Sequence, residues 1–154
     1  MISIDVNVNV QGFPTKEIGY WTLVRAYDNE IQFEVTNDSK KPIHGLNVRP
    51  VLESYVGQEK PQLYQWADPQ VIETISSNKM VPIKCIFVPH YLGLASVALY
   101  VTDADNKAVM AKRKEQSSYE EAPVRWWLHV ADDISLEILS TLKKLLARRE
   151  KTKK

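Results

Sequence analysis

The first ten residues alternate between apolar and polar side chains, and this alternation constrains the fold more than any other feature of the sequence. A period of two is typical of a β-strand with one buried face and one face in water. The same alternation returns at 31–36 and at 124–130. We therefore expect strands at all three segments. The apolar positions of the first are Ile2, Ile4, Val6, Val8 and Val10.

The β-branched side chains divide the chain into a body and a tail. Residues 1–130 contain 25 valines and isoleucines and 8 leucines, whereas residues 131–154 contain 5 leucines, 2 isoleucines and no valine. β-Branched side chains suit pleated sheets, and unbranched leucine suits helices. We predict an immunoglobulin-like β-sandwich over 1–130. Residues 131–154 are predicted to form a helix and basic tail, in the same domain or as an oligomerisation element.

The body is predicted to contain eight or nine strands with no helix between them. Parallel strands need crossover connections of a dozen or more residues, and only 53–70 is that long. The predicted class is therefore all-β: an antiparallel β-sandwich with a C-terminal amphipathic α-helix. A closed barrel is the alternative. Pro50 predicts an edge position or a bulge for its strand. The expected strands are 2–10, 20–26, 31–36, 46–52, 71–75, 81–88, 95–102, 107–111 and 124–130.

The tail has the spacing of an amphipathic helix. Asp132 or Asp133 can cap its start, where acidic side chains also suit the helix dipole. An isolated helix of this length is marginal in water, so we expect its apolar stripe to pack on the sandwich, on a second copy or on a partner. The stripe is formed by Ile134, Ile138, Leu142 and Leu145, and is widened by Leu139 and Leu146.

Two blocks of the body carry the pattern of a known family. The first is 33–37, followed by Pro42-Ile43 and 46–48, and the second is 81–89, Gly93 and 98–106. With these blocks, residues 30–110 resemble the immunoglobulin-like sandwiches of the CARDB type, which recur in bacterial and archaeal proteins. The chain departs from them before its long strand, where Ser77-Asn78-Lys79 replaces a common glycine. The resemblance implies a spacer, adhesion or assembly module, and its pattern carries no catalytic residue.

Side chains that could carry chemistry are scattered. His44, His90 and His129 lack the spacing of metal ligands, although His44 and His90 could meet at one end of a sandwich. Cys85 is alone, which excludes a disulfide framework, and sharing a strand face with Ile83 makes it a small buried residue. The sequence contains no P-loop, GxGxxG or Gly-x-Ser-x-Gly motif. We expect no catalytic residue, metal or cofactor.

Aromatic residues are the more informative candidates for binding. Tyr55, Tyr64 and Trp66 lie in the long segment 53–70, and connections of this length are uncommon unless they are functional or disordered. Folding of Trp66 over the sandwich end is the alternative. In the strand at 124–130, Trp126 is expected in the core with Val124 and Leu128, which places Trp127 on the opposite face. We expect the C-terminal helix to cover Trp127.

The net charge of +1 conceals a division within the chain. Residues 143–154 carry seven basic side chains and one acidic side chain, a net charge of +6, which leaves −5 on residues 1–142. A solvated helix end, a nucleic-acid contact and a helix that binds a partner or a membrane surface all fit this tail. The candidate contact residues here are Leu142, Lys143, Lys144, Arg148 and Arg149.

The sequence predicts a non-enzymatic protein-interaction or assembly module that binds a protein partner or itself. Nucleic-acid binding through the basic tail is the alternative. No apolar run approaches the roughly 20 residues that span a bilayer. The first five residues lack the basic start of a secretory leader, so we expect a cytoplasmic location and interpret the sequon Asn37-Asp38-Ser39 as a polar turn.

Overall fold

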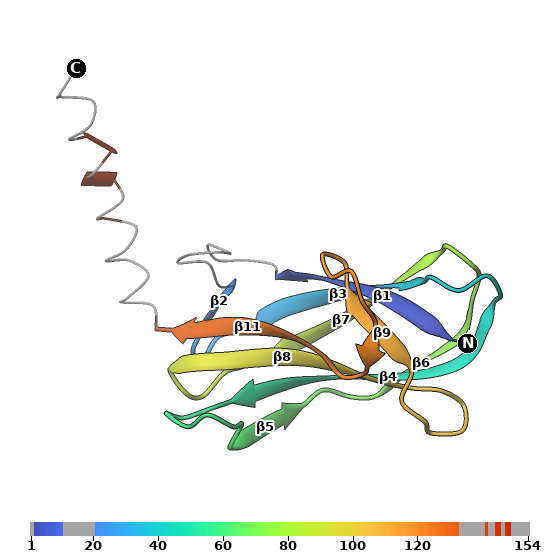
Figure 1. Ribbon diagram of the computed structural model, residues 1–154. Coiled ribbons are helices and arrows are strands. Elements are labelled where there is room, and N and C mark those ends of the chain that lie inside the picture. The colour runs from blue at the N-terminus through green and yellow to red at the C-terminus, as the bar shows by residue number, and fades with distance from the viewer. Residues whose placement is uncertain (1, 11–20, 133–140, 142–143, 146, 149–154) are drawn as a thin grey trace.

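Two packed β-sheets make up the body of the protein (Figure 1). The computed structural model describes residues 2–10, 21–132, 141, 144, 145, 147 and 148. Within them, the five-stranded sheet has the order β10-β9-β1-β3-β7, and the six-stranded sheet has the order β2-β11-β8-β4-β5, with β6 also paired to β4. The strands are β1 (Ser3–Val10), β2 (Trp21–Val24), β3 (Asn29–Asn37), β4 (Ile43–Ser54), β5 (Leu63–Trp66), β6 (Gln70–Ile75), β7 (Met80–Phe87), β8 (Gly93–Thr102), β9 (Met110–Arg113), β10 (Glu120–Glu121) and β11 (Val124–Ala131).

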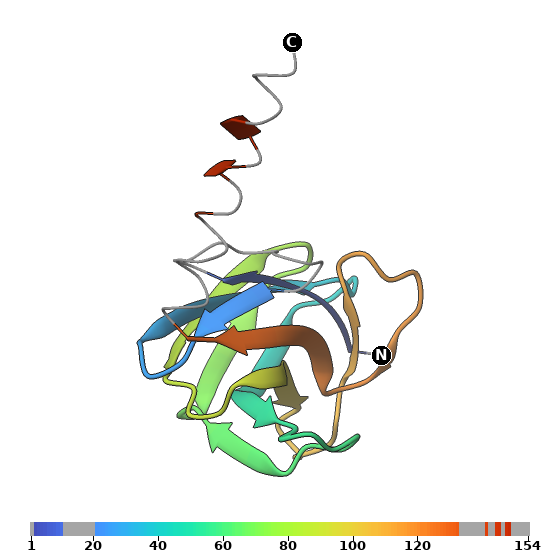
Figure 2. The ribbon, with the colours of Figure 1, turned by 90° about the vertical axis from the view of Figure 1, so that its left-hand side faces the viewer.

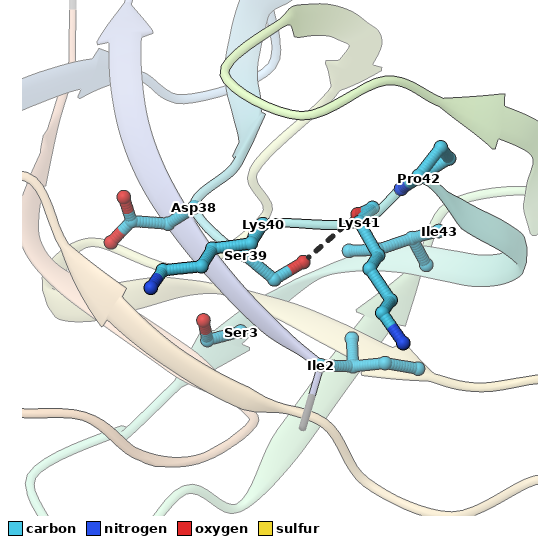
Figure 3. A pocket seen from close by; sticks show the side chains of 8 residues that line it. All are labelled: Ile2, Ser3, Asp38, Ser39, Lys40, Lys41, Pro42 and Ile43. Atoms are coloured by element: carbon cyan, nitrogen blue, oxygen red, sulfur yellow. Dashed lines mark hydrogen bonds between the residues drawn. The ribbon is translucent and has the colours of Figure 1, made fainter.

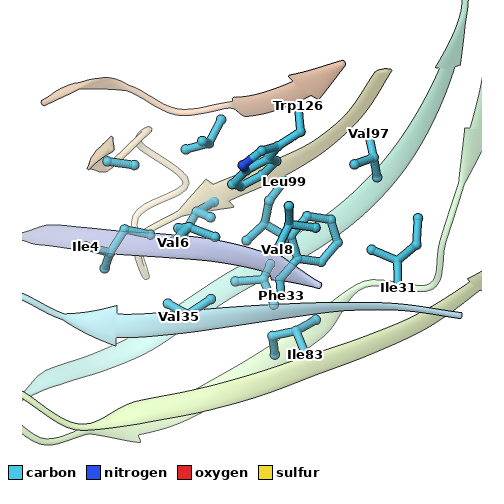
Figure 4. Close-up of a cluster of buried hydrophobic side chains, with 14 of the residues drawn as sticks. Ile4, Val6, Val8, Ile31, Phe33, Val35, Ile83, Val97, Leu99 and Trp126 are labelled. Carbon is cyan, nitrogen blue, oxygen red and sulfur yellow. The ribbon is translucent and has the colours of Figure 1, made fainter. Parts of the chain in front are cut away.

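The core lies between the two sheets and is built from the alternating apolar positions (Figure 4). Ile4 and Val6 of β1 are fully buried, as is Phe33 of β3. Phe33 meets Trp126 of β11 with ring centroids 5.6 Å apart, so the aromatic pair joins the two sheets. Fully burying one such side chain stabilises the fold by about 1.5–3 kcal/mol. The expectation that Trp126 belongs to the core is confirmed.

The all-β class is confirmed, but the expectation of purely antiparallel sheets is wrong. β1 pairs with β9 in parallel, and β11 pairs with β2 in parallel. No helical crossover is needed, because the chain between the two members of each pair forms other strands, some in one sheet and some in the other. Chain segments that pass from one sheet to the other thus make parallel neighbours. The short strands β5 and β10 were not expected.

Pro50 occupies the interior of the six-stranded sheet, so of the two expected settings, an edge or a bulge, the edge is wrong. β4 pairs with β8 on one side, and on its other side with β6 through 43–48 and β5 through 51–54. Pro50 lies where one partner ends and the other begins. There its carbonyl accepts a hydrogen bond from the Ala67 amide at 3.0 Å. The gap between partners accommodates a residue that has no N–H to donate.

The predicted C-terminal helix falls largely outside the described residues and stays a prediction. Its five described residues have helical backbone and exposed side chains. They lie away from the sandwich in both views of the ribbon (Figure 2). No helix among the described residues is long and apolar enough to cross a membrane. The five residues are Thr141, Lys144, Leu145, Ala147 and Arg148.

Candidate functional site

The two outer surfaces of the sandwich differ in chemistry. On the five-stranded sheet, the outward positions of β1 and β3 are polar, and they include Asp5, Asn7, Asn9, Gln32 and Glu34. This composition is typical of a solvated sheet face. The outward positions of the six-stranded sheet instead carry large aromatic and arginine side chains. We call this surface the aromatic face, and its members are Arg49, Tyr64, Trp66, Tyr100, Arg125 and Trp127.

Trp66 of the edge strand β5 is the centre of one half of the aromatic face. Its ring lies 6.1 Å from that of Tyr64, at 15° between planes, and 5.3 Å from that of Tyr100. The Arg49 guanidinium lies 4.9 Å from the centroid of the Trp66 ring, within the range of a cation–π contact. Although it has these neighbours, Trp66 remains 45% exposed and Tyr64 48% exposed. This half therefore offers aromatic surface that is already ordered.

A buried ion pair lies at the centre of the aromatic face. Glu53 of β4 is fully buried, and its Oε1 accepts a 2.7 Å hydrogen bond from Arg125 Nε and a 2.9 Å hydrogen bond from the Ser96 hydroxyl. Arg125 Nη2 also donates to the other carboxylate oxygen at 3.3 Å and to the Tyr100 hydroxyl at 3.2 Å. The carboxylate therefore fixes the guanidinium and, through it, Tyr100.

The same hydrogen-bond network continues to Tyr55, whose ring contacts Trp127. The hydroxyls of Tyr55 and Ser96 lie 3.0 Å apart, and the Tyr55 ring lies 5.2 Å from that of Trp127. Tyr55 is only 3% exposed, whereas Trp127 is 43% exposed. Tyr55 thus supports Trp127 from below, and the second half of the face is ordered in the same way as the first.

Two small apolar residues beneath the aromatic face are completely covered. Val51 pairs with Trp66 across β4 and β5, and Ala98 pairs with Arg125 across β8 and β11. Both are fully buried, yet neither belongs to the cluster between the sheets. The large side chains therefore pack down onto the sheet, and the six-stranded sheet carries a thin apolar layer on its outer side.

Two side chains of the face have shifted acidities. Burial, followed by the nearby Glu53 carboxylate, raises the pKa of Tyr100. The hydrogen bond from Arg125 to Glu53 raises the pKa of the guanidinium. Both shifts hold these groups protonated at neutral pH. The network is suited to fixing a surface in place, since neither group is prepared to exchange a proton.

The structure brings several of the sequence candidates onto one surface. Tyr64 and Trp66 from the long segment and Trp127 from β11 all belong to the aromatic face, while Tyr55 lies buried beneath it. Lys144 and Arg148 are exposed on helical backbone. Leu142, Lys143 and Arg149 lie outside the described residues. The expected covering of Trp127 by the helix is not seen among the described residues, of which Leu145 is 52% exposed.

Four residues of the aromatic face and of the ion pair at its centre were not predicted: Arg49, Glu53, Tyr100 and Arg125. The period of two within each strand indicates which of them point outward. Only the register between strands shows that they meet, because Arg49 pairs with Tyr100 and Arg125 pairs with Ala98. Glu53 lacked any signal of its own, since an acidic residue near a strand end is ordinarily solvated.

The histidines do not come together. His44 lies near the start of β4, where its Nδ1 is 3.1 Å from the Thr74 hydroxyl. His90 follows β7 in the connection to β8. The β4–β8 register joins Asn47 to Thr102 and Ser54 to Ala95, so the two histidines lie at opposite ends of this strand pair. The idea that they meet at one end is wrong.

Cys85 is protected rather than activated. It shares the inward face of β7 with Ile83 and Phe87 and is partly buried. Its Sγ lies 3.7 Å from the Ile31 carbonyl oxygen. Burial raises the pKa of the thiol to about 12, which leaves little thiolate, the reactive form, at neutral pH.

A hollow of about 510 Å³ lies at the end of the sandwich beside the turn after β3 (Figure 3). The exposed Lys40 and Lys41 line it. The turn is held by Asn37, which is fully buried and donates from Nδ2 to the carbonyls of Lys41 at 2.8 Å and Ile75 at 2.9 Å. The sequon asparagine therefore has a structural role in this polar turn.

Two solved structures of the CARDB domain of the PF1109 protein from Pyrococcus furiosus are similar to this chain. The crystal structure has a TM-score of 0.53 at 11% identity, and covers 84% of this chain and 89% of that one. The solution structure has a TM-score of 0.51 at 14% identity, and covers 85% and 98%. No protein-family model and no curated protein matches the chain.

The crystallised relative is a complex with di-metal ions. In this chain, the described residues bring together no group of three or more His, Cys, Asp or Glu side chains. The similarity therefore concerns the arrangement of the two sheets. The chain folds as an immunoglobulin-like β-sandwich similar to CARDB domains.

Proposed function

We propose that the protein is a non-enzymatic protein-interaction module and that the aromatic face is its contact surface. The observation that carries this proposal is the joining of Tyr64, Trp66 and Trp127 on one ordered sheet face. Tryptophan, tyrosine and arginine are enriched in the energetic centres of protein interfaces. Side chains that are fixed before binding also lose less conformational entropy when a partner arrives.

The titratable groups of the described body support an interaction role over a catalytic one. Glu53 is committed to Arg125 and Ser96, and the Cys85 thiol is held protonated by burial. A catalytic cysteine needs the opposite, which is a thiol pKa lowered toward the working pH. CARDB-type neighbours, which share this fold, are consistent with a module of this kind.

The free edge of the five-stranded sheet is a weaker candidate surface. β7 is an edge strand, and an exposed edge can pair with a strand from another chain. Pro82 and Lys84 lie within it, and both residue types oppose such pairing. The Gln70 side chain also donates to the Lys84 carbonyl at 3.2 Å. These features favour the aromatic face over strand addition at β7.

Quantitative affinity purification from the native source tests the proposal, with captured proteins measured by mass spectrometry at low and high salt. A Tyr64→Ser, Trp66→Ser variant should lose the partners that the wild type captures, and high salt should leave them bound. The matched control, Asn9→Ser with Gln32→Ser on the opposite sheet, should retain them. Equal capture by the wild type and the Tyr64/Trp66 variant would refute the proposed surface.

Nucleic-acid binding is a distinct outcome of the same comparison. It would appear as DNA or RNA binding that falls steeply with salt. The Lys144→Gln, Arg148→Gln variant would lose such binding, while the Tyr64→Ser, Trp66→Ser variant would keep it. That pattern would replace the aromatic face with the basic tail as the functional surface.

A further inference from the structure

A small hollow lined by two glutamates and two arginines adjoins the aromatic face at Trp127. It has a volume of about 210 Å³, and Glu120 and Glu121 of β10 line it together with Trp127 and Arg125. Both glutamates are exposed. Arg125 is committed to Glu53, so it does not neutralise them. The surface beside Trp127 therefore combines exposed aromatic area with two carboxylates.

Arg113 also lines this hollow, and its charge is directed elsewhere. Its Nε lies 3.4 Å from Glu115, and its Nη1 donates to the Arg125 carbonyl at 3.3 Å. Within the described part of the chain, no basic side chain lies within 4.0 Å of the carboxylates of Glu120 and Glu121. A cationic ligand would therefore meet two exposed carboxylates that form no ion pair with a described side chain.

The C-terminal segment (residues 141–148) has the complementary chemistry. Lys144 and Arg148 are four residues apart on helical backbone, which places them on one side of a helix. Leu145 stands beside them and is 52% exposed. The described residues of this segment thus present an apolar side chain flanked by two cations. The charges of −5 on residues 1–142 and +6 on 143–154 favour the same contact.

We propose that the C-terminal segment of one copy of the chain docks on the aromatic face of a second copy, beside Trp127. Leu145 packs on the Trp127 ring, while Lys144 and Arg148 approach Glu120 and Glu121. This inference rests on the proposed function, since it assigns a second copy to the Trp127 half of the same face. Reciprocal exchange of the segments gives a closed dimer, and one-way exchange gives an open chain.

A second copy is favoured over the chain's own face by the arrangement of the described residues. Those of the C-terminal segment lie away from their own sandwich in both ribbon views (Figures 1 and 2). The face and the segment are both uncovered there, with Trp127 43% exposed and Leu145 52% exposed. Two unpartnered and complementary surfaces on one chain are satisfied when two chains associate.

Sedimentation of mixed variants tests the proposal. The full chain should self-associate, more weakly at high salt because the charged contacts are screened. Leu145→Asp and Trp127→Ser should each weaken self-association by at least about tenfold. An equimolar mixture of these two variants should recover association, because the intact segment of one fits the intact face of the other. Gln32→Ala, on the opposite sheet, should change nothing.

The outcomes separate this inference from the proposed function. Wild-type chain that stays monomeric, association that survives Leu145→Asp, or variants that do not complement when mixed would each overturn docking between copies. Failure to complement, combined with a loss of stability in both variants, would indicate docking on the chain's own face. None of these results would affect partner capture through Tyr64 and Trp66, which decides the proposed function separately.

Discussion

Arg125 and Glu53 form a two-point ion pair across three strands of the six-stranded sheet, with Nε 2.7 Å from Oε1 and Nη2 3.3 Å from Oε2. The carboxylate side chain is 1% exposed and the guanidinium side chain 40% exposed. The pair is thus open on the arginine side only. When Glu53 is removed, water can still hydrate the exposed guanidinium. When Arg125 is removed, water cannot reach the buried carboxylate, so the two losses should differ in their effect on stability.

Removal of Arg125 should therefore be more damaging than removal of the Glu53 charge. Arg125→Met leaves a buried carboxylate without its cation, which should cost about 3 kcal/mol. Glu53→Gln keeps an acceptor for the Ser96 hydroxyl and should cost about 1 kcal/mol. Urea unfolding measures both. Arg49→Met, a surface arginine with a cation–π contact, is the matched control, and a loss as large as that of Arg125→Met would contradict the account.

Replacing three tryptophans one at a time should distinguish the core residue Trp126 from the surface residues Trp66 and Trp127. Trp126 is 6% exposed in the core, and Trp126→Ala should destabilise the fold by about 3–5 kcal/mol. Trp66→Ala and Trp127→Ala remove half-exposed rings and should each cost about 1 kcal/mol. Thermal unfolding provides the comparison. Equal losses from the three variants would mean that the aromatic face is structural core.

Cys85 should be nearly inert in the folded protein. With a pKa of about 12, its thiolate fraction at pH 8 is about one ten-thousandth. A disulfide reagent should therefore label it at least about a hundredfold faster in denaturant than under native conditions. Native labelling should rise with pH, since the thiolate fraction increases up to the raised pKa. Fast, pH-independent labelling of native protein would refute the buried position.

Asn37 should be the most sensitive position of the turn after β3. Asn37→Ala removes both donors to the Lys41 and Ile75 carbonyls and leaves the buried Ile75 carbonyl without this bond. The expected loss of stability is about 2 kcal/mol. Ser39→Ala, which removes a partly exposed hydroxyl of the same turn, should cost less than half as much in urea unfolding. The reverse order would show that the serine holds the turn.

The sequence predicted the strands and their buried positions better than the pairing of one strand with another. Alternation in β1, β3 and β11 identified buried positions such as Phe33 and Trp126, because burial on one face dictates a period of two. It did not predict the parallel pairs, which depend on where the chain passes between sheets. β5 was missed because four residues flanked by polar loops carry little periodicity.

The candidate site was predicted in parts and not as a whole. Tyr64 and Trp66 are predicted as binding candidates from the long segment 53–70, and Trp127 from the alternation of its strand, some sixty residues away in sequence. Their union depends on β4 and β8, whose register brings Glu53 beside Ser96. A single sequence contains no signal for such pairing across strands. The buried role of Tyr55 was missed for the same reason, since its hydroxyl partner comes from another strand.

Photo-cross-linking from the aromatic face tests the central claim most directly. A photoreactive benzoylphenylalanine in place of Tyr64, which is 48% exposed, should form covalent adducts with a protein partner when irradiated in native extract or at high concentration of the pure chain. Mass spectrometry would distinguish another protein from a second copy. The same group in place of Glu30, on the outer face of the five-stranded sheet, should form few adducts. Adducts of equal yield from both positions, or from Glu30 alone, would contradict the account.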